Sequence, residues 1–131
     1  MNTTVLTNMC LIKNKEGQIL LQNRVKKDWP GLNLPGGHVE GNEYIINSVS
    51  REIKEETGLN VTKIHCIGYY EWLNPSIGRR DLAILFIADE YSGELKSNEE
   101  GENAFYDIKE IKKHVLSTDL EKILLLFGIR I

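Results

Sequence analysis

Residues 36–59, GGHVEGNEYIINSVSREIKEETGL, constrain the fold more than any other part of the chain. Their apolar side chains recur at the spacing of one helix face, and Gly58 stands where a helix commonly ends with a left-handed residue. The same helix carries Glu52, Glu55 and Glu56 beside its apolar stripe. We therefore predict an amphipathic helix that follows the glycine-rich loop, ends at Gly58 and packs its apolar side against other elements.

The three glutamates of this helix call for a compensating charge. Like charges three or four positions apart destabilise a helix, and partly buried carboxylates are costly unless they are paired or bind a metal. In one interpretation Arg51 and Lys54 pair with them on a solvated surface. In the other they form a site for Mg²⁺, which prefers a few carboxylates and often shares its shell with substrate phosphates. The adjacent Gly36 and Gly37 favour the second interpretation because glycine lets the backbone approach a ligand, but the spacing alone leaves both open.

Strand-forming segments lie on both sides of this helix. The predicted strands cover residues 5–13, 18–25, 60–73, 79–91 and 104–108, with a short extended piece at 32–34. We expect the first two to form a hairpin through the turn at 14–17. A capping box of Thr118 and Glu121 predicts the start of a C-terminal helix. Strands and helices in mixed order indicate an α/β or α+β domain with helices packed on a sheet.

Composition narrows the class of protein. A chain of 131 residues with 41% hydrophobic and 27% charged residues has the size of one globular domain, so we predict a single domain over 1–131. The net charge of −3 offers no general attraction to a nucleic acid polymer or an anionic membrane. We also find no positively charged leader and no apolar run of membrane-spanning length. Cys10 and Cys66 lack a metal-binding spacing, and we expect free thiols in a cytoplasmic protein.

The glycine-to-leucine stretch over residues 37–59 resembles the complete Nudix box. Gly37 is followed after five residues by Glu43 and after seven more by REIKEETGL, and every defined position of the box is filled. The order of elements around the box also resembles this family over nearly the whole chain. The resemblance implies a Nudix-type α/β/α sandwich with a mixed β-sheet between helices. It also implies a Nudix hydrolase that cleaves a nucleoside diphosphate linked to another moiety, with Mg²⁺ or alternatively Mn²⁺ as cofactor.

The resemblance also implies roles for individual residues. Glu52 would be the general base or a further metal ligand, and Glu43 and Arg51 would orient the catalytic carboxylates. The metal ligands would be provided by the end of the helix, the glycine pair and a later acidic loop: Gly36, Glu52, Glu55, Glu56 and Glu100. Within that loop Glu99 and Glu102 remain alternatives to Glu100, which is favoured because it precedes a glycine.

Substrate-binding residues are harder to predict than metal ligands. Gly37 belongs to the box. Arg24 could contact phosphate or lie on the surface, and Trp29 could stack on a base or pack at the edge of the domain. Arg79 and Arg80 could reach phosphates but are expected mainly in a solvated turn.

The sequence around the box favours a nucleoside triphosphate as substrate. DWPGLNLPGGHVEGNE and EGENAFYDIKEI resemble segments of MutT-like 8-oxo-dGTP diphosphatases, which release a monophosphate and pyrophosphate. The expected function is therefore nucleotide-pool sanitation by hydrolysis of 8-oxo-dGTP or a dGTP-like nucleotide. The alternatives are an ADP-ribose or other nucleoside diphosphate pyrophosphatase, since Pro75 lies 16 residues after the box, and a nucleotide-sensing module without hydrolysis. The preferred base, the number of metal ions and the choice between monomer and homodimer stay open.

Overall fold

The computed structural model describes residues 2–25 and 29–131, so the start of the glycine-rich loop predicted from residue 26 lies outside the described part. The elements follow in the order β1 (Thr3–Ile12), β2 (Ile19–Arg24), β3 (Gly31–Asn33), β4 (Gly36–His38), α1 (Ile45–Thr57), β5 (Asn60–Asn74), the 3₁₀ helix η1 (Pro75–Ile77), β6 (Arg79–Ser92), β7 (Gly101–Tyr106), the 3₁₀ helix η2 (Ile108–Lys113) and α2 (Leu120–Leu126).

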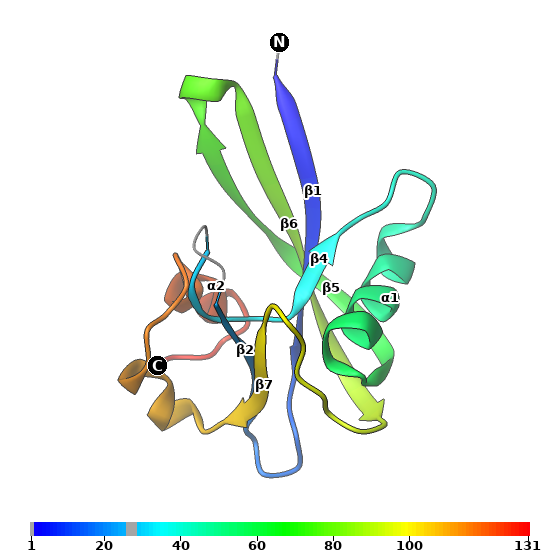
Figure 1. Cartoon of the computed structure of the whole chain (residues 1–131), viewed down its shortest axis with the longest axis vertical. Helices are drawn as coiled ribbons and strands as arrows, with labels where there is room; N and C mark the ends of the chain where they lie inside the picture. Colours follow the sequence, from blue (N-terminus) through cyan, green and yellow to red (C-terminus); the bar gives the residue numbers. More distant parts are fainter. Residues whose placement is uncertain (1, 26–28) are drawn as a thin grey trace.

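Over the described residues the strands form two sheets. The four-stranded sheet has the order β4-β1-β6-β5 and the three-stranded sheet the order β3-β2-β7. β1 pairs in parallel with β6 and antiparallel with β4, so the larger sheet is mixed. Figure 1 shows α1 and α2 on opposite sides of these strands. The predicted α/β/α arrangement with a mixed sheet is confirmed.

Alternation along the central strands divides the core into two layers. On β1, Leu11 points into the cluster that contains the buried residues of α2, whereas Ile12 points into the cluster that contains Val49 and Ile53 of α1. Successive strand residues face opposite sides of a sheet, so one apolar strand serves both helices. The predicted helix over the box is confirmed, with Gly58 at φ 81° as its left-handed cap.

The hairpin predicted from the first two strands is only partly right. The turn forms, because Asn14 N–H donates to the carbonyl of Gln18 at 3.0 Å and Lys13 bridges to Ile19. Beyond the turn the strands separate, and β2 joins the smaller sheet between β3 and β7. The physical reason is that β4 and β6 already occupy both hydrogen-bonding edges of β1.

The capping box predicted at Thr118 and Glu121 is wrong. α2 begins at Leu120 with Asp119 as its N-cap, and no side chain in the described part of the molecule makes a capping hydrogen bond to it. An N-cap residue normally has extended backbone, whereas Asp119 has φ 67°. The carboxylate of Asp119 instead accepts hydrogen bonds from side chains of β5.

Both cysteines are free thiols, as predicted. Cys10 is a buried free thiol and Cys66 an exposed one. Burial raises the pKa of the Cys10 thiol to about 12. Among residues 2–25 and 29–131, no helix has the length and apolar character needed to cross a membrane.

Candidate active site

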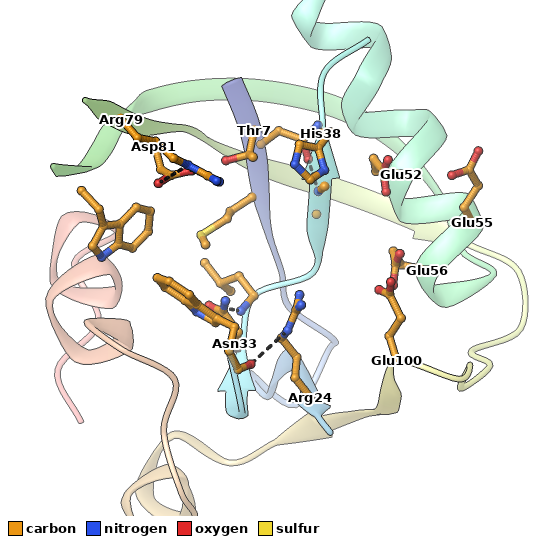
Figure 2. A pocket seen from close by; sticks show the side chains of 17 residues that line it. Thr7, Arg24, Asn33, His38, Glu52, Glu55, Glu56, Arg79, Asp81 and Glu100 are labelled. Atoms are coloured by element: carbon orange, nitrogen blue, oxygen red, sulfur yellow. Dashed lines mark hydrogen bonds and ion pairs between the residues drawn. The ribbon is translucent and has the colours of Figure 1, made fainter. Parts of the chain in front are cut away.

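A pocket of about 450 Å³ opens beside the middle of β1, between α1 and the distal part of the β5–β6 hairpin. Its volume is within the usual range of small-molecule sites. Figure 2 shows Glu52, Glu55 and Glu56 on one side of the pocket and Arg79 and Asp81 on the other. The lining residues are Thr7, Asn8, Met9, Arg24, Trp29, Asn33, Leu34, Gly36, Gly37, His38, Glu52, Glu55, Glu56, Trp72, Arg79, Asp81 and Glu100.

The most buried carboxylate of the pocket is Glu52. Its residue is 9% exposed, and this burial raises the pKa of the carboxyl group, although hydrogen bonding from Arg51 opposes the rise. A Cβ atom at Gly37 would overlap the Glu52 carboxylate, so a larger residue there would force the Glu52 side chain to move. Helix α1 and strand β4 therefore pack closely enough for the Glu52 carboxylate to contact the backbone of Gly37.

Arg51 links the carboxylates of the helix and the preceding loop. Its Nε and Nη2 atoms donate to the two oxygens of Glu43 at 3.0 and 2.6 Å, and Nη1 donates to Glu52 at 2.9 Å and Glu55 at 3.3 Å. The hydrogen bonds from Arg51 lower the pKa of the Glu43 carboxyl group. The guanidinium group also donates to the carbonyl of His38 at 2.9 Å. Arg51 thus offsets part of the repulsion between the acids and fixes the direction of Glu52.

Glu56 is held by amide groups. Its Oε2 atom accepts hydrogen bonds from Gln22 at 3.2 Å and Asn98 at 3.0 Å. Asn103, which is buried, donates to the carbonyls of Glu56 and Lys96, both at 2.7 Å. These bonds fasten the segment before β7 to the end of α1, and Figure 2 shows Glu100 reaching from that segment toward Glu56.

The glycine pair is positioned by a buried polar side chain of β1. Asn8 is 1% exposed; its amide donates to the hydroxyl of Ser48 at 2.8 Å, and its carbonyl oxygen accepts from Gly37 N–H at 3.3 Å. A Cβ atom at Gly36 would overlap the backbone of Asn8. Asn8 therefore joins β4 to α1 at the point where the backbone borders the pocket.

Aromatic side chains lie at the end of the pocket away from the glutamates. Trp72 pairs with Asp81 across β5 and β6, which places it on the side of the pocket where Figure 2 shows Asp81. Trp29 packs edge-to-face on Trp72 with ring centroids 5.3 Å apart. Arg24 donates from Nε to the carbonyl of Trp29 at 3.1 Å. The pocket therefore combines a carboxylate end with an aromatic end, and Arg24 belongs to its lining.

Most of the residues singled out in the sequence come together at this pocket. Seven line it in addition to Glu100: Arg24, Trp29, Gly36, Gly37, Glu52, Glu55 and Glu56. Arg51 and Glu43 are not among the lining residues but reach it through Glu52 and Glu55. Of the three acidic alternatives, Glu100 lines the pocket, whereas Glu99 and Glu102, the latter within β7, do not. Trp29 lines the pocket and packs on a neighbouring ring, and its contact with a base stays a prediction.

Several polar residues of the site were missed from the sequence. Asn8, Gln22 and Asn103 are buried polar residues on strands, and their position inside apolar segments is the signal that could have drawn attention to them. Arg79, at the start of β6, is exposed as expected for a solvated turn, but it also lines the pocket and pairs with Asp81 at 2.7 Å. Asp81 carried no sequence signal.

The donor set fits a divalent ion that is completed by substrate. In the described part of the chain, no three His, Cys, Asp or Glu side chains enclose a common point. Mg²⁺, however, keeps several waters and commonly uses one or two carboxylates together with substrate phosphates. Glu52, Glu55, Glu56 and Glu100 offer carboxylate oxygens on one side of an open pocket, next to the backbone of Gly36. These oxygen donors could hold a hard cation together with substrate phosphates.

Comparison with known proteins shows the family to which the chain belongs. The model of the NUDIX domain matches residues 4–127. The chain is 37% identical over 115 residues to the ADP-ribose pyrophosphatase of Methanocaldococcus jannaschii, a match that covers 86% of this chain and 67% of that protein.

Solved structures agree on the fold. The MutT NUDIX hydrolase from Burkholderia pseudomallei has a TM-score of 0.82 at 20% identity and matches over 98% of both chains. The NUDIX domain of Shewanella oneidensis NrtR, solved in complex with ADP ribose, has a TM-score of 0.81 at 15% identity over 98% of this chain and 88% of that one.

Proposed function

Because the chain belongs to the NUDIX domain family and is a Nudix pyrophosphohydrolase, we propose that it hydrolyses the diphosphate bond of a nucleoside diphosphate linked to another moiety. ADP-ribose is the first substrate to consider. The observation that carries the proposal is the two-ended pocket, with carboxylates at one end, aromatic rings at the other and Arg24 on its lining. A nucleotide presents the same order of groups, with a base at one end and phosphates at the other.

The carboxylates of the pocket would bind the metal ion and activate water. Glu52, Glu55, Glu56 and Glu100, with the carbonyl of Gly36, would hold Mg²⁺ or Mn²⁺. Such an ion neutralises phosphate oxygens and lowers the pKa of bound water. Glu52 serves as a ligand or as the base that accepts the proton of the attacking water. The base role is supported by burial, which raises the pKa of its carboxyl group toward the working pH.

The remaining roles concern orientation. Arg51 holds Oε1 of Glu52 at 2.9 Å and leaves Oε2 on the side of Gly37. Glu43 holds Arg51 from the other side. Arg24 binds a phosphate, and Trp29 and Trp72 contact the base, because aromatic rings stack on any nucleobase. Gly37 leaves room for the substrate and for Glu52.

The relatives support ADP-ribose as the leading substrate. A relative with 37% identity over most of this chain is named an ADP-ribose pyrophosphatase, and Pro75 lies in η1, 16 residues beyond the box. Hydrolysis of ADP-ribose would give AMP and ribose 5-phosphate. The second candidate is 8-oxo-dGTP or a related nucleoside triphosphate, which would give a monophosphate and pyrophosphate. It is supported by the resemblance of the segments at residues 28–43 and 100–111 to MutT-like enzymes.

The location and assembly of the protein are part of the proposal. Two free cysteines are compatible with a reducing compartment, so we propose a cytoplasmic enzyme. We treat residues 1–131 as one Nudix hydrolase domain that works as a monomer or homodimer on small nucleotides, with no role for a nucleic acid polymer or a membrane.

Product analysis separates the candidates. The purified protein is incubated with Mg²⁺ and a panel of ADP-ribose, 8-oxo-dGTP, dGTP and a dinucleoside polyphosphate, and the products are identified by mass spectrometry. AMP with ribose 5-phosphate supports the proposed substrate class. Pyrophosphate formed mainly from 8-oxo-dGTP supports the second candidate. Nucleotide binding without turnover would favour a sensing module.

A further inference from the structure

Asp119 has an unusual backbone and an unusual set of partners. It is a non-glycine residue with φ 67°, just before the first residue of α2. Its Oδ2 atom accepts hydrogen bonds from the hydroxyl of Tyr70 and from the indole Nε1 of Trp72, both at 3.0 Å. The carboxylate of Asp119 therefore connects the start of α2 to two side chains of β5.

Local roles at α2 do not account for this carboxylate. It does not cap the helix, as shown above, and its contact with Lys122 is a 3.9 Å ion pair to a largely exposed ammonium group. Exposed pairs of this kind contribute little to stability. Hydrogen bonds from neutral donors to a carboxylate are stronger than those between neutral groups. The bonds to Tyr70 and Trp72 are thus the interactions that give the side chain a defined direction.

These bonds act on the aromatic end of the pocket. Trp72 lines the pocket and packs edge-to-face on Trp29, and the ring of Tyr70 packs on Trp72 with centroids 4.9 Å apart. The torsion that sets the plane of an aromatic ring has a broad energy minimum. An indole bound at Nε1 has its plane and its edge fixed, so the ring offers the same face to every incoming base.

We propose that Asp119 is a positioning residue that holds the indole of Trp72 in the orientation needed to bind the nucleobase of the substrate. The inference rests on the proposed function, because it assigns the aromatic end of the pocket to the base. It assigns Asp119 no contact with the phosphates and no part in proton transfer. Loss of its carboxylate therefore weakens binding and leaves the chemical step unchanged.

A pair of variants isolates the carboxylate from the backbone. Glycine and asparagine both tolerate positive φ, so Asp119→Gly and Asp119→Asn avoid new backbone strain. Asp119→Gly removes the acceptor, and Asp119→Asn keeps a neutral one. Lys122→Ala is the matched control, because Lys122 faces the same carboxylate from the solvent side.

The first measurement uses the free protein. The chain has two tryptophans, so an ¹H–¹⁵N spectrum resolves their indole signals, and Trp29→Phe assigns them. We expect the Trp72 indole proton to move upfield in Asp119→Gly, to move less in Asp119→Asn and to stay in place in Lys122→Ala. An unchanged Trp72 signal in Asp119→Gly would overturn the proposal, whatever the enzyme cleaves.

The second measurement concerns binding. For Asp119→Gly we expect KM for the best nucleotide substrate and Kd for its monophosphate product, AMP or dGMP, to rise about tenfold, the scale of one lost stacking contact. We expect kcat to stay within about twofold, and Asp119→Asn to recover most of the affinity. A moved indole signal with unchanged KM and Kd would contradict the role in base binding.

The two proposals can fail separately. Absence of turnover by the wild-type protein contradicts the proposed function, while the Kd of AMP and dGMP and the indole signal still judge the role of Asp119. If neither monophosphate binds the wild-type protein, the assignment of the aromatic end to a base is wrong and the inference falls with it.

Discussion

Glu56 differs from its neighbours in how its charge is held. Among the described residues its partners at Oε2 are the amides of Gln22 and Asn98, whereas Glu52 and Glu55 each bind Arg51. Amide donors orient a carboxylate but leave its charge in place. Glu56 is therefore well suited to bind a cation, and it is the most direct single residue on which to test the metal site.

Glu56→Gln should lower kcat about a hundredfold or more, because a neutral amide is a poor ligand for a hard cation. The melting temperature without added metal should be unchanged or slightly higher, since a like-charge repulsion is removed. Glu99→Gln is the control, because that side chain is exposed and does not line the pocket. Wild-type kcat in Glu56→Gln, measured at saturating Mg²⁺, would show that Glu56 is not a ligand.

The two cysteines should differ sharply in reactivity. Burial raises the pKa of Cys10 to about 12, so at pH 8 the group stays a protonated and inaccessible thiol. Cys66 is exposed. A thiol reagent such as DTNB should therefore label one equivalent in the native protein at pH 8 and two in denaturant. Two fast equivalents in the native state would mean that Cys10 is not held in the core.

At the level of elements, Arg51 fastens the loop between β4 and α1 to the helix, chiefly through its ion pair with Glu43. Arg51 binds both oxygens of Glu43, and Glu40 N–H donates to the same carboxylate at 2.9 Å. The helix thus fixes the loop that precedes it, and with the loop it fixes the direction of Arg51 toward Glu52. The ion pair between Arg51 and Glu43 therefore affects both the stability of the fold and the geometry of the site.

This contact has a defined pH dependence. The pKa of Glu43 is lowered in the folded protein, so its contribution to stability is present above its unfolded pKa of about 4.3 and is lost as pH falls through the folded pKa. Glu43→Gln should lower the melting temperature at pH 7, and the difference from wild type should shrink as pH falls below about 4. A difference that stays constant from pH 7 to pH 3 would contradict the role of this ion pair.

Most helices and strands predicted from local patterns are present in the structure, although β4 lies in a stretch predicted as loop and β7 covers Gly101–Tyr106 and not 104–108. The other errors lie where distant residues compete. Periodicity and Gly58 were sufficient to predict α1, because a helix is specified by residues close in sequence. The pairing of β2 was mispredicted because β4 and β6 occupy both edges of β1. Thr118 was a reasonable cap by sequence, but the start of α2 is set by Asp119, whose carboxylate binds residues far away in the chain.

The site itself follows the same division. The box predicted the carboxylates and glycines that line the pocket, since their spacing is fixed by one helix and one turn. Asn8, Asn103 and Asp81 reach the site, or support it, through sheet pairing and loop packing that local spacing does not reveal.

At the scale of the whole molecule, two layers of helix and a mixed sheet serve one pocket. α1 supplies Glu52, Glu55 and Glu56, the segment before β7 supplies Glu100, and β4 supplies the glycine backbone. The β5–β6 hairpin supplies Trp72, which is bound from the α2 side by Asp119. The apolar residues of β1 pack into both core clusters. This packing fixes the position of β1 and of its polar residues Thr7 and Asn8, which line the pocket. A site assembled from so many elements requires the complete fold.

We propose that this pocket cleaves a nucleoside diphosphate bond with the help of a divalent ion. The most direct measurement compares kcat/KM for ADP-ribose and 8-oxo-dGTP with Mg²⁺, with Mn²⁺ and with excess EDTA, and identifies the products of each. We predict AMP and ribose 5-phosphate from ADP-ribose as the preferred reaction, abolished by EDTA. A preference for 8-oxo-dGTP would keep the site and change the substrate class. Turnover that persists in EDTA would contradict the role of the metal ion. No cleavage of either nucleotide with either metal would contradict the proposed activity.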